Sequence, residues 1–317
     1  MDLKKQANAG GGPSWAKDLK RDISRNWEVY VILLPIVVYY LIFNYAPMGG
    51  ALIAFQDWRP GRSWFGPDAR WVGLRHFESF FKSYYFTRTL FNTLTISLST
   101  LIWGFPAPII LAILLNELRG KLFPRLVQTI VYLPHFISMV VLCGIIRTFV
   151  AENGVVTNML SHLGFPKANM LLNARLFVPI YVISNIWQGV GWGSIVYLAA
   201  LTSIDQELYE AAEIDGAGRW KQTLHITLPG IIPTIIILFI MRMGSILSVG
   251  SEKILLLYNE GIYETADVIS TFTYRKGLLE TNWSYASAVG LFNSAVNFVM
   301  VVTVNKIARQ VGEISLW

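Results

Sequence analysis

The chain has 317 residues and a formal net charge of +6, with 54% apolar and only 15% charged residues. Soluble domains carry about 25% charged residues, so this composition excludes an ordinary water-soluble protein. Long stretches without charge alternate with short polar ones, which predicts an all-α polytopic membrane protein.

The first 27 residues form a predicted basic cytoplasmic tail. Within it, Trp15, Leu19, Ile23 and Trp27 recur every four residues between lysines and arginines, as in an amphipathic helix on the inner leaflet; a disordered tail is the alternative. The tail has no signal-peptide cleavage pattern, so the first apolar run is expected to stay in the membrane. The positive charge indicates an anionic bilayer surface as partner and no nucleic acid.

Residues 28–310 form the predicted membrane domain, followed by a short tail at 311–317. Six windows in this domain have about the 20 residues needed to cross a bilayer. They are Val29 to about Tyr45, Leu90–Leu115, Leu126–Ile146, Phe177–Leu201, Ile231–Gly250 and Trp283–Val304. Only the fifth contains a charged residue, Arg242.

The distribution of basic residues predicts the orientation of the spans. The basic tail precedes the first span, and basic flanks of a first helix usually stay in the cytoplasm. Six spans then place both termini on the cytoplasmic side of the membrane. The segments Met48–Thr89, Ala151–Arg175 and Ser251–Asn282 fall outside.

The longest cytoplasmic connection runs from Thr202 to Pro229. Ser203 with Gln206 predicts a capping box at the start of a helix. Gly216 is a typical helix end, and a second short helix fits Arg219–Thr227. The sequence therefore predicts two small helices that meet at a glycine bend.

This connection resembles the EAA signature of binding-protein-dependent ABC importer permeases. Seven positions match it at fixed spacing: Glu210, Ala211, Ala212, Gly216, Ile226, Leu228 and Pro229. A generic helical hairpin between two spans is the structural alternative. The resemblance implies the transmembrane domain fold of type I ABC importers.

The resemblance also implies the partners of the chain. In this family the loop docks into a cleft of an ABC ATPase dimer, which binds the ATP and magnesium. The coupling residues expected here are Glu207, Glu210, Ala211, Ala212, Asp215 and Gly216. A second, homologous permease subunit and an extracellular solute-binding protein would complete the transporter.

Further segments are similar to the LplB-type branch of carbohydrate-uptake permeases, relatives of the maltose permease. They include Gly104–Pro108, Tyr132–Ser138, Gly191–Ser194 and Tyr263–Ile269. This likeness implies an oligosaccharide as the substrate.

Polar residues inside the spans are candidates for the substrate pathway, because such groups are costly in lipid unless they face protein or water. Tyr181, Asn185, Gln188 and Trp192 share one face of the fourth span, and Asn293 and Asn297 share a face of the sixth. Interhelical hydrogen bonding is the alternative role of the two asparagines.

Arg242 lies near the middle of its window, where an arginine is a functional hypothesis. It would recognise a carboxylate of an acidic sugar, or alternatively pair within the bundle or with the second permease.

The sequence contains no nucleotide-binding GxxxxGK[ST] motif and no metal-ligand spacing, so neither catalytic nor metal-binding residues are predicted, and no cofactor in this chain. A secondary transporter would need inverted repeats around an ion site, and the spans lack paired acidic residues. A membrane-embedded enzyme would need a catalytic cluster at membrane depth. An ABC importer of a non-sugar solute is a further alternative, and only the LplB-type segments argue against it.

Overall fold

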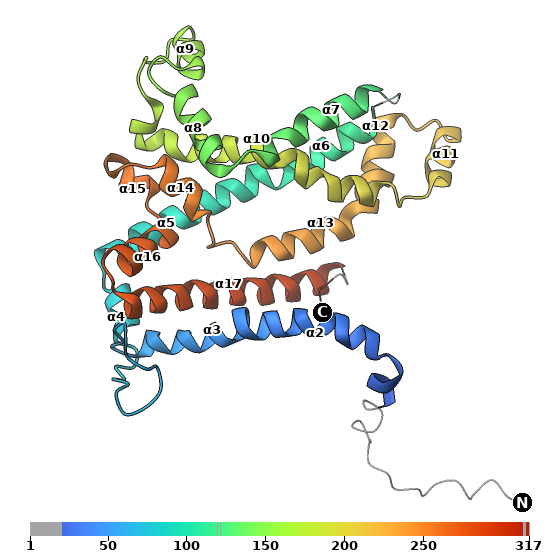
Figure 1. Cartoon of the computed structure of the whole chain (residues 1–317). Helices are drawn as coiled ribbons and strands as arrows, with labels where there is room; N and C mark the ends of the chain where they lie inside the picture. The colour runs from blue at the N-terminus through green and yellow to red at the C-terminus, as the bar shows by residue number, and fades with distance from the viewer. Residues whose placement is uncertain (1–20, 119, 121, 313–314, 317) are drawn as a thin grey trace, which may run out of the picture. The chain divides into compact units, whose positions relative to one another are not determined.

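The computed structural model describes residues 21–118, 120, 122–312 and 315–316. The chain forms two units, Met1–Leu52 and Ile53–Trp317. Within the described residues the regular structure is helical, apart from one antiparallel bridge between Gln56 and Trp71 (Figure 1). The all-α prediction is confirmed.

The first unit contains one long apolar helix. Helix α2 (Trp27–Tyr40) continues through a π-helical turn, η1 (Leu41–Tyr45), into α3 (Ala46–Met48) and the 3-10 turn η2 (Gly49–Phe55). The resulting helix of 29 residues is long enough to cross a bilayer and contains the predicted first span. Residues 15–20 of the predicted amphipathic helix lie outside the described residues. Its remaining part is helical over residues 21–25, with a bend at Asn26 before α2.

The second unit holds the remaining helices (Figure 1). In chain order they are α4 (Arg75–Phe81), α5 (Tyr84–Ser99), η3 (Thr100–Gly104), α6 (Pro106–Asn116), α7 (Leu122–Tyr132), η4 (Leu133–Phe136), α8 (Met139–Phe149), α9 (Val155–Ser161), η5 (Met170–Leu172), α10 (Ala174–Leu201), α11 (Gln206–Ile214), α12 (Arg219–Gln222), η6 (Thr223–Thr227), α13 (Leu228–Met243), α14 (Ser251–Leu257), η7 (Glu260–Ile262), α15 (Tyr263–Ala266), α16 (Ile269–Tyr274), η8 (Arg275–Leu279) and α17 (Trp283–Gly312).

Four helices of the described chain are long and apolar enough to span a membrane: Trp27–Phe55, Tyr84–Asn116, Arg219–Met243 and Trp283–Gln310. A bent pair, α7–η4 with α8, raises this number to five. Helix α10 has 28 residues and is long enough to span, but it is not among these helices. The count of six spans therefore stays a prediction.

The third predicted span, Leu126–Ile146, is wrong as a single helix. The chain turns by 102° between Leu122–Phe136 and Met139–Phe149. Pro134 lies in the 3-10 turn before the bend, and the Ser138 hydroxyl caps α8 by accepting from the Val141 N–H at 3.4 Å. The helices α7 and α8 have 11 residues each, about 16 Å of helix, which is too short to cross about 30 Å of hydrocarbon alone.

The fifth span also differs from its predicted bounds. Its helix begins at Arg219 and ends at Met243, so it starts earlier and stops before Gly250. Arg242 consequently lies in the last turn of α13 rather than near the middle of a span. A cation is favourable at this end, because the helix dipole is negative there.

Three prolines lie two residues after a π-helical turn: Pro47 after η1, Pro106 after η3 and Pro229 after η6. Proline has no N–H and its ring collides with the carbonyl four residues earlier. A widened turn at that place displaces the carbonyl, so the helix continues through the proline. The long helices Tyr84–Asn116 and Arg219–Met243 are thereby preserved.

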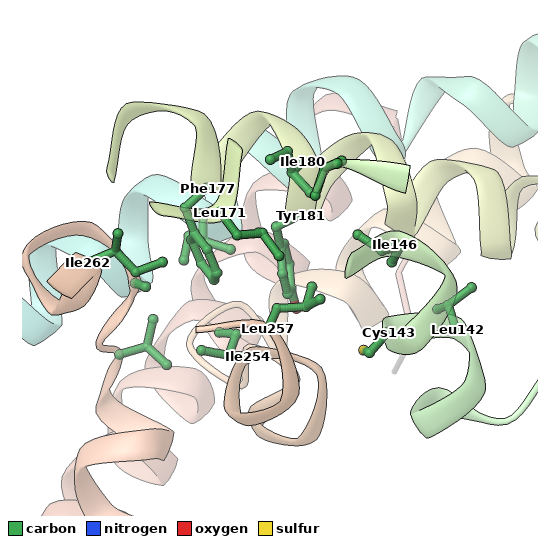
Figure 2. Packing of buried hydrophobic residues seen from close by; sticks show 14 residues of the cluster. Leu142, Cys143, Ile146, Leu171, Phe177, Ile180, Tyr181, Ile254, Leu257 and Ile262 are labelled. Carbon is green, nitrogen blue, oxygen red and sulfur yellow. The ribbon is translucent and has the colours of Figure 1, made fainter. Parts of the chain in front are cut away.

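The largest apolar core of the second unit joins α8, α10 and α14 (Figure 2). Cys143 of α8, Phe177 and Tyr181 of α10, and Ile254 and Leu257 of α14 are buried in it. This core fixes the short helix α14 against the first half of α10 and so positions the side chains discussed below.

Candidate functional site: a coupling loop and a membrane cavity

The connection after α10 folds into the helix α11, which begins one residue after Asp205. The Asp205 carboxylate accepts a hydrogen bond from the Glu207 N–H at 3.0 Å and is the N-cap. The predicted capping box at Ser203 is wrong, because the Ser203 hydroxyl donates backward to the Ala200 carbonyl at 2.7 Å. The negative charge of Asp205 is also stabilised by the positive end of the helix dipole.

Gly216 ends α11, as the sequence predicts. Its φ of +73° lies in the left-handed region, which glycine adopts without steric cost. The Gly216 N–H donates to the Glu213 carbonyl at 3.0 Å and the Ala217 N–H donates to the Ala212 carbonyl at 2.8 Å. These two hydrogen bonds form a Schellman motif, which reverses the chain direction at the loop tip.

The expected second short helix, Arg219–Thr227, is instead the first part of the long helix Arg219–Met243, because α12, η6 and α13 are continuous. Two contacts anchor the loop to this helix and to the bundle. The Tyr209 hydroxyl lies 3.0 Å from Thr227 Oγ1, and Arg219 pairs with Glu117 at 3.6 Å. The first of these contacts attaches α11 to the helix Arg219–Met243, which is long enough to span a membrane.

The loop presents most of the predicted coupling residues to solvent. Of the six predicted coupling residues, Ala212 is half-buried and the other five are exposed. Two large apolar side chains are exposed beside them, Ile214 at 87% and Trp220 at 73%. Small, acidic and apolar groups on one projecting element are suited to docking a protein partner. The coupling role of the individual residues stays a prediction.

A cavity of about 620 Å³ lies within the second unit, between α5, α6, α10, α13 and the segment that follows α13. Tyr181, Asn185 and Arg242 of the predicted pathway line it. Phe105 adds half-buried aromatic surface, and Arg242 is the one charged residue in this lining. Aromatic faces with polar groups between them suit a sugar-sized ligand.

The other predicted pathway residues lie elsewhere. Gln188 and Trp192 are not part of the lining, which continues along α10 through Gly189 and Gly193. The Trp192 ring stacks on His135 with centroids 4.4 Å apart and an interplanar angle of 2°. Their contact with a substrate stays a prediction.

The two asparagines of α17 also lie outside the cavity lining. Asn297 is buried, accepts from the Leu247 N–H and donates to the Ser248 hydroxyl, both at 3.0 Å. It thus satisfies the backbone where the chain leaves α13, in agreement with the alternative of interhelical hydrogen bonding. Asn293 carries a buried oxygen without a partner among the described residues.

Lys253 of α14 was missed by sequence reasoning. It is only 2% exposed, and its ammonium donates to Asn185 Oδ1 at 2.6 Å and lies 5.2 Å from the centre of the Tyr181 ring. Burial lowers the pKa of the Lys253 ammonium to about 8. The residue falls in a segment predicted to lie outside the membrane, where a lysine is ordinary and does not indicate a functional site.

The second unit has long apolar helices and a helical loop at one end (Figure 1). Together with the cavity among these helices, this arrangement defines an integral membrane permease. Residues 104–311 match the family "binding-protein-dependent transport system inner membrane component", to which the chain belongs.

Similar proteins agree with this assignment. The chain is 42% identical to Protein LplB of Bacillus subtilis, over 98% of this chain and 96% of the relative. It is 42% identical to the polygalacturonan/rhamnogalacturonan transport system permease protein YteP of the same organism, over 90% and 88%. A subunit of a bacterial ABC transporter that imports the acidic polysaccharide alginate has the same fold. Its crystal structure matches with 47% identity and a TM-score of 0.85, over 93% of this chain and 99% of that subunit.

Proposed function

We propose that the chain is one of two permease subunits of an ATP-driven importer of oligosaccharides and forms half of its translocation pathway. The observation that carries the proposal is the exposed loop around Glu210, which displays the EAA-type signature on a helix, a left-handed glycine and the start of a long apolar helix. Closure of an ATPase dimer on this loop would move α13 and switch the access of the cavity.

The similar proteins support an oligosaccharide substrate, because their names specify polygalacturonan, rhamnogalacturonan and alginate. The alginate transporter was also solved with its pentasaccharide-bound periplasmic protein, which supports a solute-binding protein as partner here. We further propose a bacterial plasma membrane location with both termini in the cytoplasm. ATP and magnesium would be held by the ATPase subunits and not by this chain.

Reconstitution tests this function. The chain, its partner permease, the ATPase subunits and the solute-binding protein are placed in proteoliposomes, and oligosaccharide uptake is measured with and without ATP. We expect uptake that needs ATP and survives collapse of ion gradients by ionophores. Uptake driven by an ion gradient without ATP would instead identify a secondary transporter.

Substitution of Glu210 tests the coupling loop. Glu210→Ala should lower ATP-dependent uptake more than tenfold, since losing one partner of a desolvated interfacial charge pair costs about 2–5 kcal/mol. Glu152→Ala, at another exposed glutamate, is the matched control and should leave uptake unchanged. Equal uptake by the Glu210 variant and the control would argue against coupling through this residue.

A further inference from the structure

Lys253 is a buried cation without an anionic partner. Its side chain is enclosed between α14 and α10, where it meets the Asn185 amide oxygen and the Tyr181 ring. Among the described residues, the ion pairs do not include Lys253, and the adjacent Glu252 is exposed. Burying an ammonium group costs several kcal/mol unless an opposite charge compensates it. An ionisable group in this position therefore calls for a partner from outside the chain.

The cavity is next to this lysine. Asn185 and Tyr181, the two residues that contact Lys253, both line the cavity of about 620 Å³. The Lys253 ammonium thus lies directly behind the cavity wall and is hydrogen-bonded to one of the residues that form it. Its flexible four-carbon stem permits the head group to exchange the Asn185 oxygen for a ligand oxygen.

The charged side chains in and next to the cavity wall are all positive. Arg242 is the charged group of the lining, and the lining contains no aspartate or glutamate. Lys253 adds a second positive charge behind Asn185. Cavities with walls of low dielectric constant and charges of one sign concentrate ions of the opposite sign. Neutral sugars need neither cation, whereas an oligosaccharide with two carboxylates can compensate both.

We propose that this cavity is selective for carboxylate-bearing oligosaccharides, and that Lys253 and Arg242 are the residues that recognise the carboxylates. Phe105, a half-buried residue of the lining, offers aromatic surface to the pyranose rings between the acidic groups. The inference rests on the proposed function and adds the substrate class and the residues that determine it.

The experiment uses the complete transporter in proteoliposomes with ATP and its solute-binding protein. Tetragalacturonate and its carboxyl-reduced neutral counterpart are loaded on the binding protein to equal occupancy, and the ratio of their uptake rates is measured. Lys253→Gln keeps an N–H donor for Asn185 but removes the charge. We expect this variant to lower the acidic-to-neutral ratio about tenfold, the effect of losing one charge-assisted hydrogen bond.

Two controls separate recognition from structure. Lys82→Gln removes a lysine whose side chain is 80% exposed and should leave the ratio unchanged. The melting temperature of the Lys253→Gln complex should not fall, because an uncompensated buried charge is removed, whereas a purely structural lysine would give a lower melting temperature and an unchanged ratio. That result would overturn the inference.

The remaining outcomes are also decisive. A wild-type transporter that carries the neutral sugar and rejects tetragalacturonate would overturn the inference and leave the proposed function standing. Unchanged ratios in both Lys253→Gln and Arg242→Gln would do the same. A wild-type transporter that carries neither sugar with ATP would refute the proposed function and this inference together.

Discussion

Gly191 shows how a single residue sets the distance between two helices. It lies on α10 where this helix crosses α7, and a Cβ at this position would overlap the carbonyl oxygen of Val131. Backbone atoms cannot yield as a flexible side chain does, so α10 and α7 approach this closely only with glycine here.

Substitution of Gly191 should therefore be destabilising. Gly191→Ala forces the two helices apart, and overpacking of this kind costs about 1–3 kcal/mol or more. The measurement is the melting temperature and yield of the purified complex. Gly144→Ala on α8, where a Cβ meets nothing within 4 Å, is the control and should be tolerated. A stable Gly191→Ala protein would show that α7 and α10 separate easily.

The charge of Lys253 predicts a pH dependence of selectivity. Its pKa is lowered to about 8, so raising the pH from 7 to 9 removes the ammonium charge from most molecules. Cys143 and Tyr181 are the titratable groups that face it. The acidic-to-neutral uptake ratio of the wild type should fall several-fold over this interval, whereas that of Lys253→Gln should stay flat. Parallel profiles would assign the pH effect to another group.

Among the elements, the segment from α15 to η8 is held to α5 by a buried ionic cluster. Asp267, with no exposed surface, accepts from Arg275 at 2.7 Å, from Arg88 at 3.3 Å and from the Thr271 hydroxyl at 2.9 Å. The Asn92 amide donates to the Asp267 carbonyl at 3.0 Å. One carboxylate thus forms ion pairs with two guanidinium groups and joins the segment that follows α14 to α5.

Breaking this cluster should loosen the segment. Asp267→Asn leaves two partly buried arginines without their anion, and removing one partner of a buried pair costs about 3–5 kcal/mol. Asp57→Asn breaks an exposed pair with Arg70 at 3.7 Å, which should cost about 0–1 kcal/mol. Thermal unfolding of both variants measures the difference. Equal melting temperatures would mean that the Asp267 cluster contributes little to stability.

At the scale of the second unit, α11 lies at one end of the bundle, and α4, α9 and α15 lie at the other (Figure 1). This arrangement supports the proposed orientation, with the coupling loop inside and the long connections outside.

Cysteine labelling tests this orientation. In a Cys143→Ser background, Glu78→Cys on α4 should react with a membrane-impermeant maleimide in intact spheroplasts, because its side chain is exposed at the outer end. Glu207→Cys on α11 should react only after permeabilisation. Labelling of Glu207→Cys in intact spheroplasts would contradict the proposed orientation and support the opposite one.

The sequence by itself determined the class of fold and the coupling loop. The length of an apolar run predicts a membrane helix without knowledge of the helices that pack on it, because such a helix satisfies its own backbone hydrogen bonds. Gly216 predicts a left-handed turn for a local steric reason, since glycine has no Cβ. The ends of α10 at Leu201 and the start of α17 at Trp283 are likewise as predicted.

Only the tertiary structure decided where helices break and which polar residues meet. The apolar pattern does not reveal the 102° bend before α8, and the backbone beyond the end of α13 at Met243 is satisfied by Asn297, 50 positions away from Leu247 in the chain. Helical spacing grouped Trp192 with Tyr181, but packing turned Trp192 to His135. Lys253 reaches Asn185 from 68 positions away in the chain, and such a contact arises only when α14 packs on α10.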